Sequence, residues 1–168
     1  MKYITGYHGT SKSAAKQIIE EQKFTLSKKN TEWLGTGVYF YPNYSDALEW
    51  KDINEHAILH SVICVNENEV IDLSNAKGKA LLHNCKQILK ATLDDEIVKQ
   101  LDNIEERQCY VCNFLWKANP KIKVIIGEFP TERSVFTTLT DERKFRKEFC
   151  VRESKYISTI DNISIVER

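Results

Sequence analysis

The sequence predicts a mixed α+β domain from three observations. Short apolar runs typical of strands occur near both ends of the chain. Between them, residues 76–118 contain no proline and a single glycine, Gly78, and their apolar side chains recur at helical spacing. A chain of 168 residues is long enough to bury one compact core. We therefore expect a single domain over residues 1–168, with strands at both ends and a helical insertion at about 76–118.

Caps and turns separate the N-terminal elements. Ser11 or Ser13 is the N-cap of a first helix, and Pro42 ends a short apolar strand that follows two glycines. The elements expected here are a strand at about 2–7, a helix to about Gln22, a strand at 38–41 and a helix from Ser45 to about Lys51.

The remaining elements follow from apolar runs and from helical periodicity. Buried strands are expected at 57–65 and 69–73, and strands return at 122–126, 149–152 and 160–166. Two or three helices fit the insertion, at about 76–91, 94–103 and 105–118. These helices either pack over a sheet or form a docking face for a partner.

The composition is that of a soluble globular protein. Lys plus Arg and Asp plus Glu both number 24, so the net charge of zero gives no global attraction to nucleic acid or to a membrane. No apolar run reaches the roughly 18 residues that span a bilayer, and the N-terminus lacks an apolar signal region. We expect a cytoplasmic protein with no membrane partner.

The five cysteines fit a reducing compartment, because they are odd in number and lie in apolar stretches. Cys109 and Cys112 form a Cys-x-x-Cys pair, but a structural zinc site needs four ligands. The other candidates, His83 and Cys85, do not have a familiar spacing. Thiols three residues apart on a helix are more simply core residues, so we expect no metal.

Two N-terminal passages carry side chains with chemical potential in a defined order. The first is Tyr7–Thr10, which contains His-Gly-Thr at a strand end. The second is Gly35–Trp50, which contains Gly-Thr-Gly-Val-Tyr-Phe and then a helix. Each piece alone is common, and Gly35–Gly37 lacks the Gly-Lys-Ser/Thr of a phosphate loop. Their combination, order and spacing are far more specific.

In these passages the chain resembles the ADP-ribosyltransferase superfamily, in the His-Tyr-Glu branch of diphtheria toxin and the poly(ADP-ribose) polymerases. The resemblance implies two small antiparallel sheets around a cleft for NAD, the co-substrate. It makes His8 and Tyr39 catalytic residues. His8 would bind the ribose hydroxyls, and Thr10 would add a further hydroxyl. The backbone of Gly9 would bind the carboxamide, since a residue without Cβ lets a ligand approach closely. Tyr39 and Trp50 would sandwich the nicotinamide, although the family usually has Tyr at the second position.

The resemblance also implies a catalytic glutamate at the start of a late strand. It binds the ribose and stabilises positive charge that develops as the glycosidic bond breaks. Glu148 holds that position, and alternation places it on one strand face with Cys150 and Arg152. Glu153 is the main rival, and Glu128 is another candidate.

Two other branches of the superfamily fit less well. The arginine-modifying branch uses an Arg, a Ser-Thr-Ser type motif and a Glu-x-Glu, which we do not find. The tRNA 2′-phosphotransferase branch uses additional arginines and a second histidine. Neither His56 nor His60 lies in a comparable motif, so that branch is only a minor alternative.

The segment before Glu148 is the presumed acceptor loop, at about 130–147. Its basic residues include Arg143, Arg146 and Lys147, which we assign to the acceptor. Basic residues beside the NAD site could contact the phosphates of RNA or DNA, or the pyrophosphate of NAD. They could equally serve solubility alone.

Small stand-alone microbial transferases of this kind are often toxins of toxin–antitoxin or anti-phage defence systems. The resemblance therefore implies a toxin that transfers ADP-ribose from NAD to nucleic acid, with an antitoxin or inhibitor as a further partner. The alternatives are a protein acceptor and a non-catalytic NAD-binding module.

Overall fold

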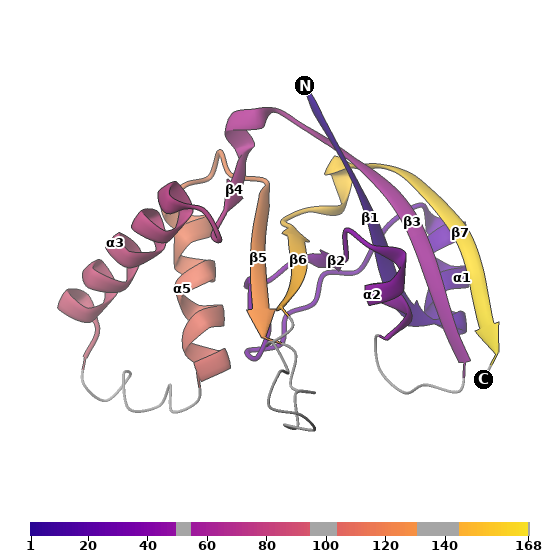
Figure 1. Ribbon diagram of the computed structural model, residues 1–168, viewed down its shortest axis with the longest axis horizontal. Coiled ribbons are helices and arrows are strands. Elements are labelled where there is room, and N and C mark those ends of the chain that lie inside the picture. The colour runs from indigo at the N-terminus through magenta and orange to yellow at the C-terminus, as the bar shows by residue number, and fades with distance from the viewer. Residues whose placement is uncertain (50–54, 95–103, 131–144, 168) are drawn as a thin grey trace, which may run out of the picture.

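The computed structural model describes residues 1–49, 55–94, 104–130 and 145–167, and it is a mixed α+β domain with two sheets (Figure 1). The α+β class is therefore confirmed. The insertion helix expected at 94–103 and the residues Trp50 and Arg143 lie outside these ranges, apart from Asp94.

The first sheet is antiparallel and has the order β1-β3-β7. Its strands are β1 (Lys2–Ser11), β3 (Glu55–Val65) and β7 (Ile157–Glu167). Helix α1 (Lys12–Glu21) follows β1 directly, and the hydroxyl of Ser11 accepts a hydrogen bond from the Ala14 backbone N–H at 3.2 Å. Ser11 rather than Ser13 is thus the N-cap, and Gln22 ends the helix in the left-handed region with a φ of 49°.

The second sheet has the order β2-β6-β5-β4 and is not wholly antiparallel. Its strands are β2 (Val38–Phe40), β6 (Phe145–Val151), β5 (Val124–Pro130) and β4 (Val70–Asp72). Strands β4 and β5 pair in parallel, so the expectation of purely antiparallel sheets is wrong for this pair. The reason is the helical insertion, which carries the chain back to the starting edge as a crossover connection does.

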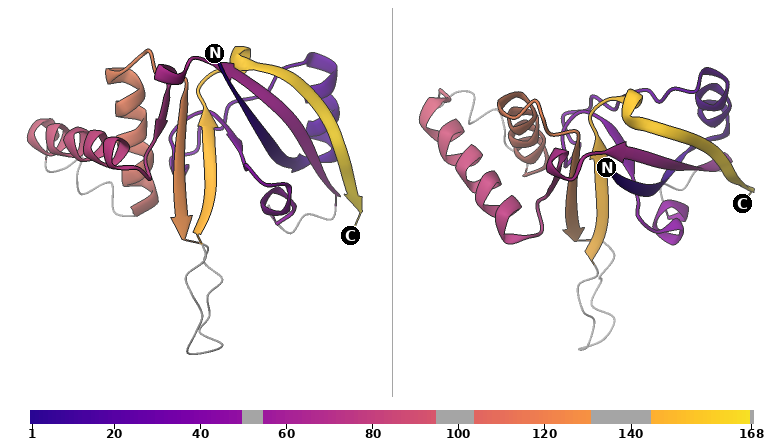
Figure 2. Two further views of the ribbon diagram at one scale, coloured as in Figure 1. Left: turned by 45° about the horizontal axis from the view of Figure 1, so that its top comes forward. Right: turned by 90° about the horizontal axis from the view of Figure 1, so that it is seen from above.

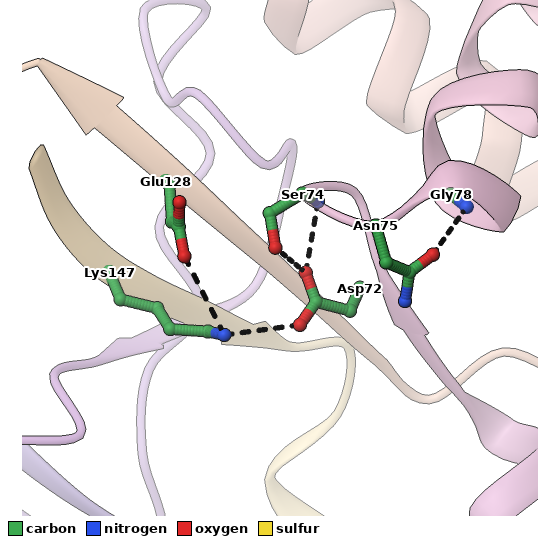
Figure 3. Close-up of polar contacts among 6 residues, drawn as sticks. All are labelled: Asp72, Ser74, Asn75, Gly78, Glu128 and Lys147. Carbon is green, nitrogen blue, oxygen red and sulfur yellow. Dashed lines mark hydrogen bonds and ion pairs between the residues drawn. The ribbon is translucent and has the colours of Figure 1, made fainter.

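The described helices beyond α1 are α2 (Tyr44–Leu48), α3 (Ala76–Thr92) and α5 (Ile104–Ala118). Helix α3 begins against β4, where Asn75 accepts from the Gly78 backbone N–H at 2.9 Å (Figure 3). A Cβ on Gly78 would lie 1.9 Å from the Asp72 carbonyl oxygen, so only glycine permits this approach. Among the helices in the described ranges, none is long and apolar enough to cross a bilayer.

Helices α3 and α5 lie on one side of the second sheet and the first sheet lies on the other (Figure 2). An apolar cluster fills each side. The first joins that sheet to α1 and the first sheet, and includes Phe24, Phe40 and Phe149. The second joins it to α3 and α5, and includes Leu115 and Trp116. The inner face of α5 is therefore a packing face, as one of the two interpretations of the insertion expected.

Candidate functional site

The two sheets meet where β1 and the end of β2 come together. Tyr7 and Tyr41 exchange two backbone hydrogen bonds, each of 2.9 Å. Residues two apart on a strand direct their backbone groups to the same edge, so the N–H and C=O of Gly9 also point toward β2. None of the described residues bonds Gly9 on that edge. A donor and an acceptor thus lie side by side where the sequence predicts the carboxamide.

The His8 side chain lies between β1 and β2, next to the bridge between Tyr7 and Tyr41. Its Nδ1 donates to the Tyr39 carbonyl oxygen at 2.8 Å, and its ring packs edge-on against Phe24 at 5.1 Å. Burial lowers the pKa of His8, which keeps the imidazole neutral. Because the carbonyl requires the proton on Nδ1, Nε2 is left as an acceptor for a hydroxyl.

Tyr39 is half-buried, and its hydroxyl is already occupied. The hydroxyl donates to the Gly35 carbonyl at 2.6 Å and accepts from the Leu34 backbone N–H at 2.9 Å. Burial raises the pKa of Tyr39, so the hydroxyl stays protonated. The ring of Tyr39 packs in part against the apolar cluster that includes Leu115 and Trp116, so only its exposed part remains for the stacking that the resemblance implies.

Glu148 lies on β6, the strand that pairs with β2. Register pairs Tyr39 with Cys150 and Phe40 with Phe149, which brings Glu148 next to Tyr41. The Tyr41 hydroxyl is close enough to the Glu148 carboxylate to favour its ionised form. Burial is the largest cause that raises the pKa of Glu148 to about 7. A carboxyl perturbed in this way, on the strand that pairs with the strand of Tyr39, is typical of a functional site.

The two rival glutamates are in more exposed positions. The carboxylate of Glu153 pairs with Lys155 at 2.6 Å, and this bond lowers its pKa. Glu128 lies on β5, and its carboxylate is 3.8 Å from the Lys147 ammonium. Both are ordinary surface ion pairs, whereas Glu148 is half-buried without a salt bridge of its own within 4 Å among the described residues.

The described basic residues of the acceptor loop are ion-paired. Arg146 binds Glu49 and lies 3.6 Å from Asp46, while Lys147 binds Asp72 at 3.1 Å (Figure 3). An anionic acceptor would have to compete with these carboxylates, so their assignment to the acceptor stays a prediction.

Of the remaining residues predicted to bind NAD, Thr10 lies in the described ranges and Trp50 does not. Thr10 is buried on β1, two residues beyond His8 and on the same strand face.

Two cavities of about 360 and 380 Å³ lie near α3 and α5, and neither is lined by His8, Tyr39 or Glu148.

Helix α5 holds the loop that leads into Tyr39, a role that the sequence analysis missed. Four side chains on one face of the helix bond backbone groups of residues 29–36. They are Cys109 to Lys29 O (3.5 Å), Cys112 to Trp33 O (3.4 Å), Asn113 from Thr36 N (2.8 Å) and Trp116 to Leu34 O (3.2 Å). Their helical spacing was visible in the sequence, but their partners were not.

These contacts give the Cys-x-x-Cys pair a structural role. Burial raises the pKa of the Cys112 thiol to about 12, which makes it inert as a nucleophile near neutral pH. Within the described ranges, no three His, Cys, Asp or Glu side chains gather as metal ligands.

Replacing Asn113 with Ala is expected to loosen this loop. The Thr36 N–H loses its acceptor, which costs about 1–3 kcal/mol when the donor cannot reach water. Hydrogen exchange at the Thr36 amide should speed up by at least about fivefold. Asn84→Ala, at an exposed position on α3, is the control. Unchanged exchange at Thr36 would show that the loop does not depend on α5.

Comparison with known proteins adds one distant relative. No protein-family model matches the sequence. An uncharacterized protein, MJ0359, from Methanocaldococcus jannaschii is 26% identical over 167 aligned residues, which cover 88% of this chain and 75% of the relative. Its name states no activity, so function must be inferred from the chemistry of the site.

Proposed function

We propose that the protein is an NAD-dependent mono-ADP-ribosyltransferase with the ADP-ribosyltransferase fold. It transfers ADP-ribose from NAD to an acceptor and releases nicotinamide. The observation that carries this proposal is the junction of β1 and β2, where no described residue bonds the Gly9 backbone on its β2 edge and His8 bonds the Tyr39 backbone. Glu148, with its raised pKa, lies on the adjoining strand.

Each of these groups has a distinct part in the chemistry. The N–H and C=O of Gly9 bind the carboxamide, and the Tyr39 ring stacks on the nicotinamide. Nε2 of neutral His8 accepts a hydrogen bond from a ribose hydroxyl. Ionised Glu148 stabilises the positive charge on the ribose as the bond to nicotinamide breaks and its electron pair leaves with the base. The acceptor nucleophile then bonds to the same carbon and loses a proton.

The acceptor is proposed to be nucleic acid, and the protein to act as a toxin. The basic residues before Glu148 support this, since phosphate contacts need a local cationic patch on a chain of zero net charge. One observation favours a protein acceptor instead: Arg146 and Lys147 are each compensated by two carboxylates. A protein acceptor is therefore the second candidate.

The experiment incubates the protein with NAD labelled in its ADP-ribose part and with cell lysate. RNase, DNase and protease are then applied separately, and Glu148→Gln protein is the matched control. Label that a nuclease removes supports the nucleic-acid acceptor. Label that only protease removes shows that the acceptor is a protein. If the wild-type protein binds NAD by calorimetry but releases no nicotinamide and leaves no label, the chain is a binding module and the enzyme proposal is wrong.

A further inference from the structure

Tyr41 follows the last residue of β2 and links the second sheet to the first. Residues 38–40 pair with β6, but Tyr41 itself exchanges its backbone hydrogen bonds with Tyr7 of β1. This double attachment fixes the Tyr41 backbone at the junction, and its side chain shares the strand face of Tyr39 and Glu148. The register of β2 with β6 places half-buried Tyr41 next to Glu148, and its hydroxyl favours the ionised form of that carboxylate.

Arg146 covers the ring of Tyr41. Its guanidinium carbon lies 5.6 Å from the ring centroid, within range of a cation–π contact. The guanidinium is held by Glu49 and lies 3.6 Å from Asp46, at the C-terminal end and within α2 respectively. Only 19% of the Arg146 side chain is exposed, so it is held against Tyr41 on one side and α2 on the other.

We propose that Tyr41 is a positioning residue for Glu148, and that Arg146, anchored by α2, keeps the Tyr41 hydroxyl on the carboxylate. This inference rests on the proposed function for its catalytic consequence, but the contact itself can be measured without NAD. A tyrosine that served packing alone would leave the carboxylate unchanged when its hydroxyl was removed.

The charged and titratable groups around Glu148 act in opposite directions. Burial disfavours the ionised carboxylate, as do Glu32 from the loop before β2 and Asp46 from α2. Arg146 on the same strand and the Tyr41 hydroxyl favour it. Removing the hydroxyl should therefore raise the pKa of Glu148 further above 7, by about one unit, since a hydrogen bond to a charged group is of that order.

The test replaces Tyr41 with Phe, which keeps the ring under Arg146 and removes only the hydroxyl. Tyr7→Phe is the matched control, because it removes a hydroxyl from the other residue of the same bridge, whose ring contacts Tyr44 and His60. Carbon-13 NMR of the glutamate side-chain carboxyls follows the titration, and the Glu148 signal is assigned by its absence in Glu148→Gln. Arg146→Gln should also raise the pKa, while Arg146→Lys, which keeps the charge, should raise it less.

Nicotinamide release is then measured against pH for the same variants. We expect the midpoint of the rise in rate to move to alkaline pH by about one unit in Tyr41→Phe and to stay in place in Tyr7→Phe. A Glu148 titration that is unchanged in folded Tyr41→Phe overturns the positioning role, whatever the activity. A shifted titration in a protein that never cleaves NAD supports the positioning role and overturns the proposed function instead.

Discussion

Glu148→Gln is expected to lower nicotinamide release by about 100- to 1,000-fold, the usual cost of removing one electrostatic stabiliser of a transition state. The amide keeps the size of the side chain. It carries no negative charge, so it cannot stabilise the positive charge that develops on the ribose. The measurement is single-turnover nicotinamide release at about pH 8, where wild-type Glu148 is mostly ionised.

The matched control for this loss is Glu153→Gln. Glu153 lies five residues further along the chain, but its side chain is 42% exposed and its carboxylate pairs with Lys155. Its replacement should leave the rate near that of the wild type. If instead Glu153→Gln abolished release and Glu148→Gln did not, the catalytic glutamate would have been assigned to the wrong residue.

The same Glu148→Gln variant is expected to be more stable than the wild type at alkaline pH. The pKa of Glu148 rises from 4.5 to about 7 on folding, so the folded state holds the proton more tightly than the unfolded state. The resulting stabilisation is fully present below pH 4.5 and is lost as the pH rises through 7. Glutamine is neutral at every pH, so the Glu148→Gln variant loses no stability from this position as the pH rises.

The size of this effect follows from the shift. A difference of about 2.5 pH units corresponds to an upper limit of about 3 kcal/mol, and partial solvent access will reduce it. Urea unfolding at about pH 5 and about pH 8.5 measures it. Glu153→Gln should act in the opposite direction, because the pKa of Glu153 is lowered and its contribution is lost toward acid pH. Equal pH dependence in the wild type and Glu148→Gln would mean that Glu148 is ionised as freely as a surface carboxylate.

Most elements could be predicted because local rules decide them. A serine before a helical period placed the start of α1, and Pro42 marked the end of the strand that contains Tyr39. Strand β6 was expected at 149–152 but occupies Phe145–Val151. Its first half carries Arg146, Lys147 and Glu148, and these charges hide the strand pattern because their partners come from other elements.

The site could be predicted in part for a similar reason. His8, Gly9 and Tyr39 lie in two short motifs, so the sequence alone could single them out. The contact of Tyr41 with Glu148 depends on the register between β2 and β6, and the hold of α5 on residues 29–36 depends on packing across more than 70 positions. Neither register nor packing is encoded in the spacing of residues along one segment.

The pairing of β2 with β6 also determines when the protein can fold during its synthesis. Tyr39 and Cys150 are neighbours in the sheet but lie far apart along the chain, and β6 is the strand that joins β2 to β5. Such long-range pairing forms late, because a long loop must close before its contacts stabilise it. On a ribosome, β1, α1 and β2 emerge early, but β2 cannot pair until β6 has been synthesised. Any activity that depends on Glu148 can therefore begin only after nearly the whole domain has been synthesised.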